Sequence, residues 1–303
     1  MISAIGPFQV RRLLGRGSYG EVYEAEGDLA VKVMRPDRQT PQQSARFRSE
    51  AAALAAVEHP AVMALKAPLA ELPDGTLYFA MELVTGGSLA ELVARGGYSA
   101  RQLLDIGAAL ADGLDCLHQA GVLHRDLAPS NILLDLTLRP RIADLGLART
   151  AQEGPTPDFW FAHGDPEYAA PERLFHIESG EMGDAYSLGA VLYTLYTRSN
   201  LFRLSELSFL YSLYTRQIEQ FFRTCLQQGL PCPRVDFRAV YEHYVARAPE
   251  LRFVPAVAVD SPVRQGIEEV LSDLLQPDSW RRLKRHGSLS GIKERLSELG
   301  EVA

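Results

Sequence analysis

The pattern of the chain changes at Gly86-Gly87-Ser88, which divides it into two parts of different character. Before this point, short β-rich segments alternate with turns that contain glycine, whereas after it the apolar residues mostly recur at helical spacing. Such a change predicts two lobes joined by a short connection. We therefore expect an α+β fold in a single domain, residues 1–303, with a small, mainly β lobe over about 1–84, a connection over about 82–88, and a larger, mainly helical lobe over about 89–303 that includes an extended helical region over about 201–260.

The first part of the chain has the pattern of a small sheet with one helix. Gly27-Asp28 and Asp74-Gly75 are dipeptides that favour hairpin turns between antiparallel strands. An alanine-rich stretch over about 41–57 predicts a helix, which contains Glu50. Strands are predicted over 10–14, 20–25, 29–34 and 77–84.

The second part of the chain has the pattern of a helical lobe. Ser99 and Gln102 are spaced as a capping box, and the apolar positions that follow lie on one helical face until Gly121. The stretch 184–196 is almost wholly apolar, which predicts a helix buried in the centre of the lobe. Further amphipathic helices are expected from there to the end of the chain.

The composition excludes several classes of protein. Of the 303 residues, 47% are hydrophobic and 23% are charged, which predicts a globular chain rather than a disordered or fibrous one. The formal net charge of −7 argues against a nucleic-acid-binding protein, because phosphate backbones are bound by clustered cations. The three cysteines lack a CxxC spacing, so neither a disulfide framework nor a zinc site is expected. No segment has the pattern of a secretion signal or of a membrane span, and we expect a soluble, cytoplasmic protein.

Three glycines stand at G-x-G-x-x-G spacing in the segment Gly15-Arg-Gly17-Ser-Tyr-Gly20-Glu-Val22. Glycines at this spacing let backbone N–H groups close over phosphates, although the motif alone is weak evidence. Here a predicted strand follows the loop, instead of the helix of a dinucleotide-binding fold, so the loop is expected to lie between two strands as a lid. Lys32 lies on the next predicted strand, ten residues after Val22; taken alone, a strand lysine is typical of a protein surface.

Two further segments supply the residue types that phosphoryl transfer requires. A segment that begins His-Arg-Asp places the carboxylate of Asp126 and the amide of Asn131 five residues apart, and Asp144-Leu-Gly follows thirteen residues later. Asp126 is expected to accept a proton from a hydroxyl group, while Asn131 and Asp144 offer hard oxygen ligands to Mg²⁺. Glu50, eighteen residues after Lys32, lies where it could pair with Lys32 across the small lobe, although a lone glutamate on a helix is by default a solvated surface residue.

Taken together, these ordered motifs resemble those of a eukaryotic-type, Ser/Thr-like protein kinase, and the Arg and Ala bias of the chain fits a bacterial member. Two more segments agree with this resemblance. Gly164-Asp165-Pro-Glu-Tyr-Ala-Ala-Pro-Glu172 is similar to the family's segment that ends in Ala-Pro-Glu, and Asp184-Ala-Tyr-Ser-Leu-Gly is similar to the start of its buried central helix. The resemblance is close over about residues 8–201 and looser beyond them.

The resemblance implies an enzyme of two lobes that binds ATP and Mg²⁺, or Mn²⁺ in its place, in the cleft between them and acts on a protein. It implies that Lys32 holds the α- and β-phosphates, that Glu50 fixes the ammonium group of Lys32, and that Asp126 and Asn131 complete the catalytic set. The metal ligands would be Asn131 and Asp144. The residues implied to bind the nucleotide are Leu14, Gly15, Gly17, Gly20, Val22, Ala30, Lys32, Met81 as the gatekeeper, Glu82, Val84 and Leu133.

Two structural contacts are also implied by the resemblance. A hydrophobic spine would stack three side chains: Leu54, His124 and Leu145, the last in place of the more common Phe. Glu172 would pair with a late arginine, either Arg281 or Arg282.

The chain departs from the family pattern near Asp126. Two residues after this aspartate, Ser/Thr kinases carry a Lys, and many tyrosine kinases carry an Ala with an Arg two residues later, whereas this chain has Ala128 and Ser130. The family's Gly-Thr before the Ala-Pro-Glu segment is replaced by Gly164-Asp165. We expect a basic substrate to replace the missing cation, and we expect the Asp165 carboxylate to raise the pKa of Asp126. The alternative is that Asp165 pairs with an arginine away from the cleft.

A Ser/Thr protein kinase is therefore the expected function. One alternative is a non-catalytic binding module that uses the kinase fold, as the loss of a lysine at Ala128 suggests, although the other motif residues are retained. The second alternative is a kinase that acts on Tyr or on a non-protein hydroxyl. No membrane span, nucleic acid or particular oligomer is implied.

Two regions leave the mode of regulation open. Arg125 is the kind of residue that contacts a phosphorylated activation segment, in which Thr150 and Thr156 carry hydroxyls beside an acidic and aromatic patch over 158–161. Activation by an added phosphate and permanent ordering by packing are both compatible with this pattern. The stretch 204–253 is longer than is usual in the family, and either extra helices that pack on the lobe or a docking surface would account for it.

Overall fold

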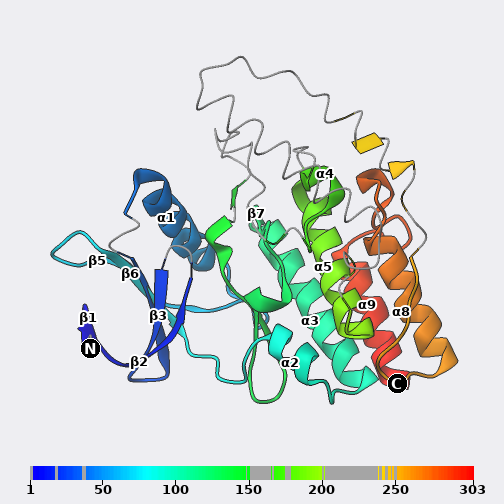
Figure 1. Cartoon of the computed structure of the whole chain (residues 1–303), viewed down its shortest axis with the longest axis horizontal. Helices are drawn as coiled ribbons and strands as arrows, with labels where there is room; N and C mark the ends of the chain where they lie inside the picture. The colour runs from blue at the N-terminus through cyan, green and yellow to red at the C-terminus, as the bar shows by residue number, and fades with distance from the viewer. Residues whose placement is uncertain are drawn as a thin grey trace.

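The molecule consists of a strand-rich lobe and a helical lobe, which lie side by side in Figure 1. The first, drawn in blue and cyan, contains the N-terminus, and the second, drawn from cyan through green and orange to red, contains the C-terminus. The lobes are joined by residues 83–88, where the sequence pattern predicts the connection. The computed structural model describes residues 3–17, 20–35, 39–147, 149–150, 165, 167–174, 179–199, 201, 238, 241–242, 245–246, 248 and 251–303.

The small lobe is built on one antiparallel sheet of six strands in the order β1-β2-β3-β4-β6-β5. The hairpin between β3 and β4 turns at Gly27 and Asp28, whose φ angles of 78° and 55° are left-handed and suit a tight hairpin. At the turn between β5 and β6, the N–H of Thr76 donates to the carboxylate of Asp74, and the turn is closed in this way. The strands span Ala4–Ile5 (β1), Phe8–Arg16 (β2), Gly20–Ala25 (β3), Leu29–Met34 (β4), Leu65–Glu71 (β5) and Leu77–Glu82 (β6).

Three of these strands contain or match predicted ones, and β6 ends two residues before the predicted end at residue 84, whereas β1 and β5 are not predicted. Strand β5 lies at the edge of the sheet, contains Lys66 and Pro68, and pairs with β6 through two shifts of register. An edge strand tolerates proline and polar residues because one side of its backbone has no neighbouring strand. The alternation of apolar and polar residues is therefore too weak in β5 to predict it.

Helix α1 (Pro41–Ala55) covers one face of the sheet. Thr40 caps its N-terminus, where the hydroxyl accepts the N–H of Gln43 at 3.3 Å, and Pro41 occupies the first turn, where its missing N–H has no cost. The helix ends two residues earlier than the sequence predicts. Its buried face presents Phe47, Glu50 and Leu54 to the rest of the molecule.

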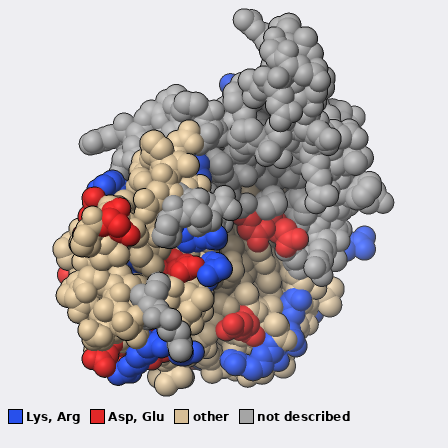
Figure 2. Space-filling view, turned by 60° about the vertical axis from the view of Figure 1, so that its left-hand side comes forward, with Lys and Arg blue, Asp and Glu red and all other residues tan. Residues whose placement is uncertain are grey.

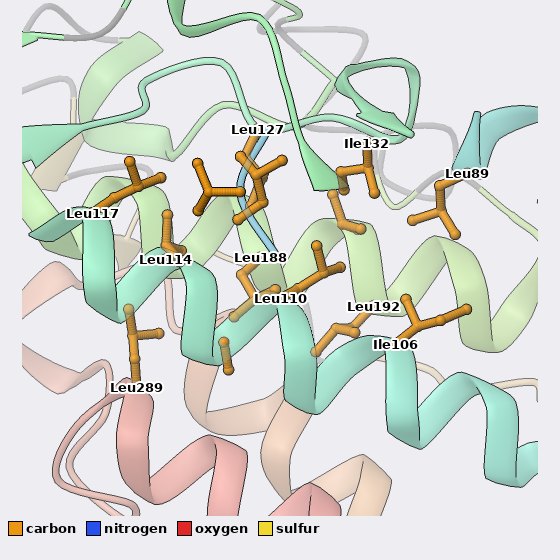
Figure 3. Close-up of a cluster of buried hydrophobic side chains, with 14 of the residues drawn as sticks. Leu89, Ile106, Leu110, Leu114, Leu117, Leu127, Ile132, Leu188, Leu192 and Leu289 are labelled. Carbon is orange, nitrogen blue, oxygen red and sulfur yellow. The ribbon is translucent and has the colours of Figure 1, made fainter. Parts of the chain in front are cut away.

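The helical lobe is organised around two long helices, α3 and α5, which run side by side in Figures 1 and 3. Ser99 caps α3 with the predicted capping box, because its hydroxyl accepts the N–H of Gln102 and the Gln102 side chain accepts the N–H of Ser99. Helix α5 contains the predicted central stretch and is buried along nearly its whole length. The helices are α2 (Leu89–Arg95), α3 (Ala100–Gln119), α4 (Pro171–Leu174), α5 (Gly180–Thr197), α8 (Ser261–Leu274) and α9 (Leu289–Val302).

Short elements connect the helices and bring the polar motifs to the boundary between the lobes. Two pairs of antiparallel strands lie here: β7 (Val122–Leu123) with β10 (Arg149–Thr150), and β8 (Ile132–Leu134) with β9 (Pro140–Ile142). Each strand is only two or three residues long, which is too short for a periodic pattern to predict it. The 3₁₀ turns among the described residues are η2 (Pro129–Asn131), η3 (Leu145–Leu147) and η6 (Ser279–Arg281).

One hydrophobic core extends through both lobes. In the helical lobe it fills the space between α3, α5 and the neighbouring loops, as Figure 3 shows for Leu110, Leu114 and Leu188. The same cluster continues into the small lobe through Phe47 and Phe79, whose rings lie 5.1 Å apart. A second, smaller cluster covers the other part of the sheet and consists of Ile5, Ala25, Val31, Val33, Tyr78 and Ala80.

Several sequence predictions fall outside the described residues. These are Thr156, the patch over 158–161, Cys225 and Cys232, and most of the region 201–260. Among the helices that the structure describes, none has the length and apolar character needed to cross a bilayer.

Candidate active site

Strand β4 places Lys32 on the inner face of the sheet. Lys32 pairs directly with Val22 of β3, and Ala30, two residues away on the same strand, pairs with Met81 of β6. Paired residues and residues two apart on a strand lie on one face of a sheet, so these four side chains share a face. It is the face toward α1, because Lys32 contacts Glu50 of that helix. Four of the residues predicted to bind the nucleotide are thus brought together.

Lys32 connects the two lobes through its ammonium group. Its Nζ lies 2.5 Å from Oε1 of Glu50 and 3.3 Å from Oδ1 of Asp144, and the Lys32 and Glu50 side chains are only 12% and 5% exposed. The predicted pair between Lys32 and Glu50 is therefore present. Burial lowers the pKa of Lys32, but the two carboxylates outweigh burial and raise the pKa above its ordinary value. Lys32 also lowers the pKa of Asp144, so the two groups stay charged at neutral pH.

The loop that carries Asp126 is held from below by Asp184 of α5. The buried Asp184 carboxylate accepts the backbone N–H of His124 at 2.7 Å and that of Arg125 at 2.8 Å, and it lies 3.0 Å from Nε2 of His118. Arg125 has a φ of 66°, a left-handed conformation that is strained for a residue with a side chain. The two bonds to Asp184 hold the backbone in this conformation.

His124 fixes the backbone of Asp126 in turn. The Nδ1 atom of the fully buried His124 ring accepts the N–H of Asp126 at 3.2 Å. A ring nitrogen that accepts an N–H carries no proton itself, so the ring proton lies on Nε2, which donates to the carbonyl of Ala143 at 3.2 Å. His124 thus ties the segment of Asp126 to the segment of Asp144.

The Asp126 carboxylate is oriented by two donors. Its Oδ1 accepts the backbone N–H of Asp165 at 2.9 Å, and its Oδ2 accepts Nδ2 of Asn131 at 3.2 Å. Burial raises the pKa of Asp126, while the Asp165 N–H lowers it. The pKa of Asp126 is raised, as the sequence predicts, but the predicted cause, the Asp165 carboxylate, is wrong. The Asp165 carboxylate accepts the N–H of Glu167 at 3.0 Å, where it closes a turn, and it pairs with no arginine in the described residues. The carboxylate that raises the pKa of Asp126, in addition to burial, is that of Asp144.

Asn131 and Asp144 present oxygen atoms that fit a hard divalent cation. Nδ2 of Asn131 donates to the carbonyl of Asp126 at 2.8 Å as well as to its carboxylate, which turns the Asn131 amide oxygen away from Asp126. The carbonyl of Asn131 accepts the N–H of Ala143 at 2.9 Å, so Asp144 lies next to it along the chain. The Asp144 side chain is 53% exposed, and its φ of 58° is left-handed. Amide and carboxylate oxygens are the ligands that Mg²⁺ prefers.

The connection between the lobes has a backbone free for a ligand. Within the described residues, no hydrogen bond reaches the backbone of Val84, whereas the N–H of Leu83 donates to the carbonyl of Asp28 at 3.1 Å. The connection then runs against β8: the N–H of Gly86 donates to the carbonyl of Leu134 at 2.8 Å. A Cβ on Gly86 would lie 2.5 Å from that carbonyl oxygen, so only glycine allows this approach.

The support behind the connection between the lobes is not evident from the sequence. The Glu82 side chain accepts the N–H of Ala64 at 2.9 Å, and its Oε1 lies 3.3 Å from Nε of Arg141 on β9. Arg141 pairs across the β8–β9 ladder with Leu133, a residue predicted to bind the nucleotide. No signal in the sequence distinguishes Arg141 from the many other arginines of the chain.

The glycine-rich loop lies between β2 and β3, as the sequence predicts. The N–H of Gly17 donates to the carbonyl of Gly20 at 2.8 Å, and Gly15 pairs with Val22. Leu14 lies at a shift of register in β2 and is 39% exposed. A Cβ on Gly20 would lie 3.0 Å from the carbonyl oxygen of Val33 and 3.5 Å from the Lys32 side chain, so the loop begins β3 directly beside Lys32.

Of the two structural contacts implied by the resemblance, the ion pair of Glu172 is present, and the three residues of the implied spine are all buried. Leu54, His124 and Leu145 are buried, with 3%, 0% and 0% exposure, and the turn η3 that begins at Leu145 packs against α1. Glu172 pairs with Arg282 rather than with Arg281, which is exposed and lies 3.4 Å from Asp278.

Over the face of the molecule in Figure 2, the acidic and basic side chains of the described residues lie intermingled.

Comparison with known proteins agrees with this geometry. A family model described as protein kinase domain matches residues 8–290. Serine/threonine-protein kinase PknA of Mycobacterium tuberculosis is 32% identical over 202 residues, which are 63% of this chain and 47% of the relative. Serine/threonine-protein kinase PknE of Mycobacterium bovis is 31% identical over 256 residues, which are 82% of this chain and 44% of the relative. The chain thus spans about half the length of the curated relatives it matches.

The family match covers most of the chain and includes both lobes. It starts at the first residue of β2 and includes every polar residue placed at the boundary between the lobes above. The resemblance noted in the sequence is therefore confirmed, and the chain belongs to the protein kinase domain family.

Proposed function

We propose that this chain is an ATP- and Mg²⁺-dependent protein kinase that transfers the γ-phosphoryl group to a Ser or Thr hydroxyl of a protein. The observation that carries the proposal is the set of contacts among Lys32, Glu50 and Asp144, which places a buried cation opposite Asp126 and Asn131. Phosphoryl transfer depends mainly on positioning and on charge stabilisation, and this set supplies both. The printed names of the relatives, which are serine/threonine-protein kinases, support the choice of acceptor.

Asp126 accepts the proton of the attacking hydroxyl. Its two oxygens are already oriented by Asp165 N–H and by Asn131, so the base needs little reorganisation when a substrate arrives. Burial raises the pKa of Asp126 and makes the carboxylate a stronger base than an exposed aspartate. The bond that Asp126 forms to the hydroxyl proton replaces part of the solvation that burial removes.

The nucleotide would bind on the inner face of the sheet, beneath the glycine-rich loop. Val84, whose backbone has no hydrogen bond within the described residues, would offer its N–H and carbonyl to the edge of the adenine, and Val22, Ala30 and Leu133 would contact the ring. Lys32, held in place by Glu50, would contact the α- and β-phosphates. Asn131 and Asp144 would hold Mg²⁺, which would neutralise charge on the phosphates.

A basic protein segment is the preferred substrate. The position at which Ser/Thr kinases carry a lysine is occupied by the buried Ala128, so no cation comes from that position. The Asp144 carboxylate is exposed by half and raises the pKa of Asp126, so a negative charge acts on the base although Lys32 and Arg173 lie nearby. A substrate lysine or arginine compensates this charge during transfer.

Transfer of label from γ-labelled ATP tests the proposal. The purified chain is incubated with Mg²⁺, labelled ATP and a mixture of protein substrates, and the product is examined by phosphoamino-acid analysis. Phosphoserine or phosphothreonine is expected, and Lys32→Met and Asp126→Asn should each abolish it. The matched controls are Lys66→Met on the exposed edge strand β5 and Asp105→Asn on the surface of α3, which should retain the rate.

Two results would contradict the proposal. Undiminished transfer by both Lys32→Met and Asp126→Asn would show that the labelled product does not arise at this site. Label found only on tyrosine or on a non-protein acceptor would replace the Ser/Thr assignment. The preference for basic segments is tested separately with paired peptides that differ only in flanking Lys or Ala residues.

A further inference from the structure

Lysine is rare in this chain, and one lysine other than Lys32 occupies a built position. Only four of the 31 basic residues are lysines. Lys66 and Lys284 are exposed, but Lys293 of α9 is partly buried and donates to Oδ1 of Asp112 on α3 at 2.8 Å. A position that keeps a lysine in an arginine-rich chain invites a physical explanation.

Asp112 is shared between two partners. Its other oxygen, Oδ2, lies 3.2 Å from Nε2 of His59, in the loop that follows α1. The Nδ1 atom of His59 accepts the N–H of Ala61 at 3.1 Å, so the ring proton lies on Nε2 and points at Asp112. Burial raises the pKa of Asp112, but Lys293 and His59 outweigh burial and lower the pKa, in agreement with an ionised carboxylate that serves both partners.

This sharing explains why lysine is suited to position 293. An ammonium group donates from one point and leaves the second carboxylate oxygen for His59. A guanidinium group binds both oxygens of a carboxylate in a fork, and an arginine at this position would compete with His59 for Oδ2. The prediction is specific: the charge-conserving change Lys293→Arg disturbs the contact of His59.

The loop that contains His59 follows α1 and fixes the C-terminal end of this helix. Helix α1 ends at Ala55, four residues before His59. The same loop is joined to β9, because the N–H of Ile142 donates to the carbonyl of Ala61 at 2.7 Å. It also lies tightly against α3, since a Cβ on Gly113 would lie 3.0 Å from the Cβ of Ala61.

Helix α9 brings Lys293 to this point with little freedom. It packs along α3 and α8, and Gly107 and Gly266 leave the space into which Leu296 and Leu299 fit. Arg101 of α3 donates to the carbonyl of Gly300 near the end of α9, so a second polar contact holds the helix. Helix α9 therefore holds Lys293 in a fixed position within the helical lobe.

We propose that Lys293, Asp112 and His59 form a clamp that ties the C-terminal helix α9 to the base of α1 and thereby positions Glu50 against Lys32. The three residues touch neither nucleotide nor substrate, so they are positioning residues. The inference rests on the proposed function, because the position of Glu50 matters for catalysis only where Lys32 binds phosphates. The structural part of the clamp stands apart from catalysis and can be measured without it.

Hydrogen exchange of the full chain measures the clamp directly. Exchange at the amides of residues 50–63 is compared for the wild type, Asp112→Asn, Lys293→Arg and the exposed control Lys284→Arg. Faster exchange is expected in Asp112→Asn and Lys293→Arg and not in Lys284→Arg, because only the changes at Asp112 and Lys293 disturb the bond to His59. Unchanged exchange at residues 50–63 in Lys293→Arg would overturn the clamp.

Kinase assays of the same proteins then test the action through Glu50. Lys293→Arg is expected to lower kcat by about three- to tenfold, a typical size for a coupled site outside the catalytic centre, with no loss in Lys284→Arg. In a Glu50→Gln background the same change should alter the residual rate by less than about twofold. An equal loss in both backgrounds would show that the clamp acts on the structure generally and not through Glu50.

The two proposals fail in different ways. Faster exchange in Lys293→Arg, together with no phosphoryl transfer by the wild type, would leave the clamp in place and remove the proposed function. Active wild type with unchanged exchange would remove the clamp and leave the function.

Discussion

Arg282 offers a sharp test of the structure, because its neighbour Arg281 provides a control. The Arg282 and Glu172 side chains are 0% and 1% exposed, and the guanidinium donates to both oxygens of Glu172. The same guanidinium donates to three backbone carbonyls, at 2.7 Å, 2.9 Å and 3.2 Å, and lies 4.9 Å from the centre of the Tyr186 ring. Arg282→Met removes all these contacts, whereas Arg281 is 70% exposed.

The expected loss in the free energy of unfolding follows from the groups that Arg282→Met leaves buried without a partner. Removing one partner of a buried ion pair costs about 3–5 kcal/mol, because the other charge stays buried without compensation. The three carbonyls that lose a donor place this variant at the upper end, near about 5 kcal/mol. At about 2 °C per kcal/mol for a chain of this size, the expected fall in Tm is roughly 10 °C. Arg281→Met should change the free energy of unfolding by less than about 0.5 kcal/mol.

Urea denaturation and thermal melting of the purified variants measure these values. The double variant Glu172→Met with Arg282→Met should be more stable than Arg282→Met alone, because no uncompensated charge remains buried. Equal losses in Arg281→Met and Arg282→Met would refute the assignment of the pair. A double variant no more stable than the single one would refute the argument about buried charge.

Three further outcomes are expected. Glu50→Gln should lower transfer by about a hundredfold because it frees Lys32, and it should lower Tm by less than Arg282→Met does, because Lys32 keeps its ion pair with Asp144; wild-type kinetics at saturating ATP would contradict this. Gly86→Ala should raise the KM for ATP and destabilise the chain by about 1–3 kcal/mol, since its Cβ would clash with a carbonyl oxygen 2.5 Å away; nucleotide titration and melting check both. Burial raises the pKa of Asp184, but the hydrogen bonds to its carboxylate outweigh burial and lower the pKa in the folded protein. The ionised carboxylate therefore stabilises the fold fully above the unfolded-state pKa of about 3.9. This stabilisation is lost as the pH falls through the pKa of Asp184 in the folded protein. The gap in unfolding free energy between wild type and Asp184→Asn should therefore narrow from pH 7 to pH 3, and a constant gap would count against this linkage.

Sequence patterns predicted those parts of the fold that repeat regularly. The hairpin at Gly27-Asp28, the capping box at Ser99 and the central helix α5 all appear where the sequence places them, because each depends on local turn chemistry or on helical periodicity. The pair of Lys32 with Glu50 was also anticipated, although each residue taken alone has the pattern of a surface residue and only the other ordered motifs made the pairing expected.

The remaining features depend on contacts that no local pattern encodes. The Asp165 carboxylate was expected to act on Asp126, yet Asp165 contacts Asp126 through its backbone N–H. Its side chain closes the turn at Glu167 instead. Arg141 supports Glu82 from a strand of three residues. The choice of Arg282 over Arg281 depends on which of two adjacent side chains faces the core, and the sequence left it open.

The continuous core has a consequence for how the two lobes depend on each other. Phe47, Leu54 and Phe79 of the small lobe belong to the same apolar cluster as α3 and α5, and only the smaller cluster around Val31 and Tyr78 belongs to the sheet alone. A fragment of residues 1–84 would expose the inner face of α1 and retain too little apolar burial to remain folded. The small lobe is therefore expected to unfold together with the helical lobe in one cooperative transition, and a split of the gene at the connection would yield an insoluble first half.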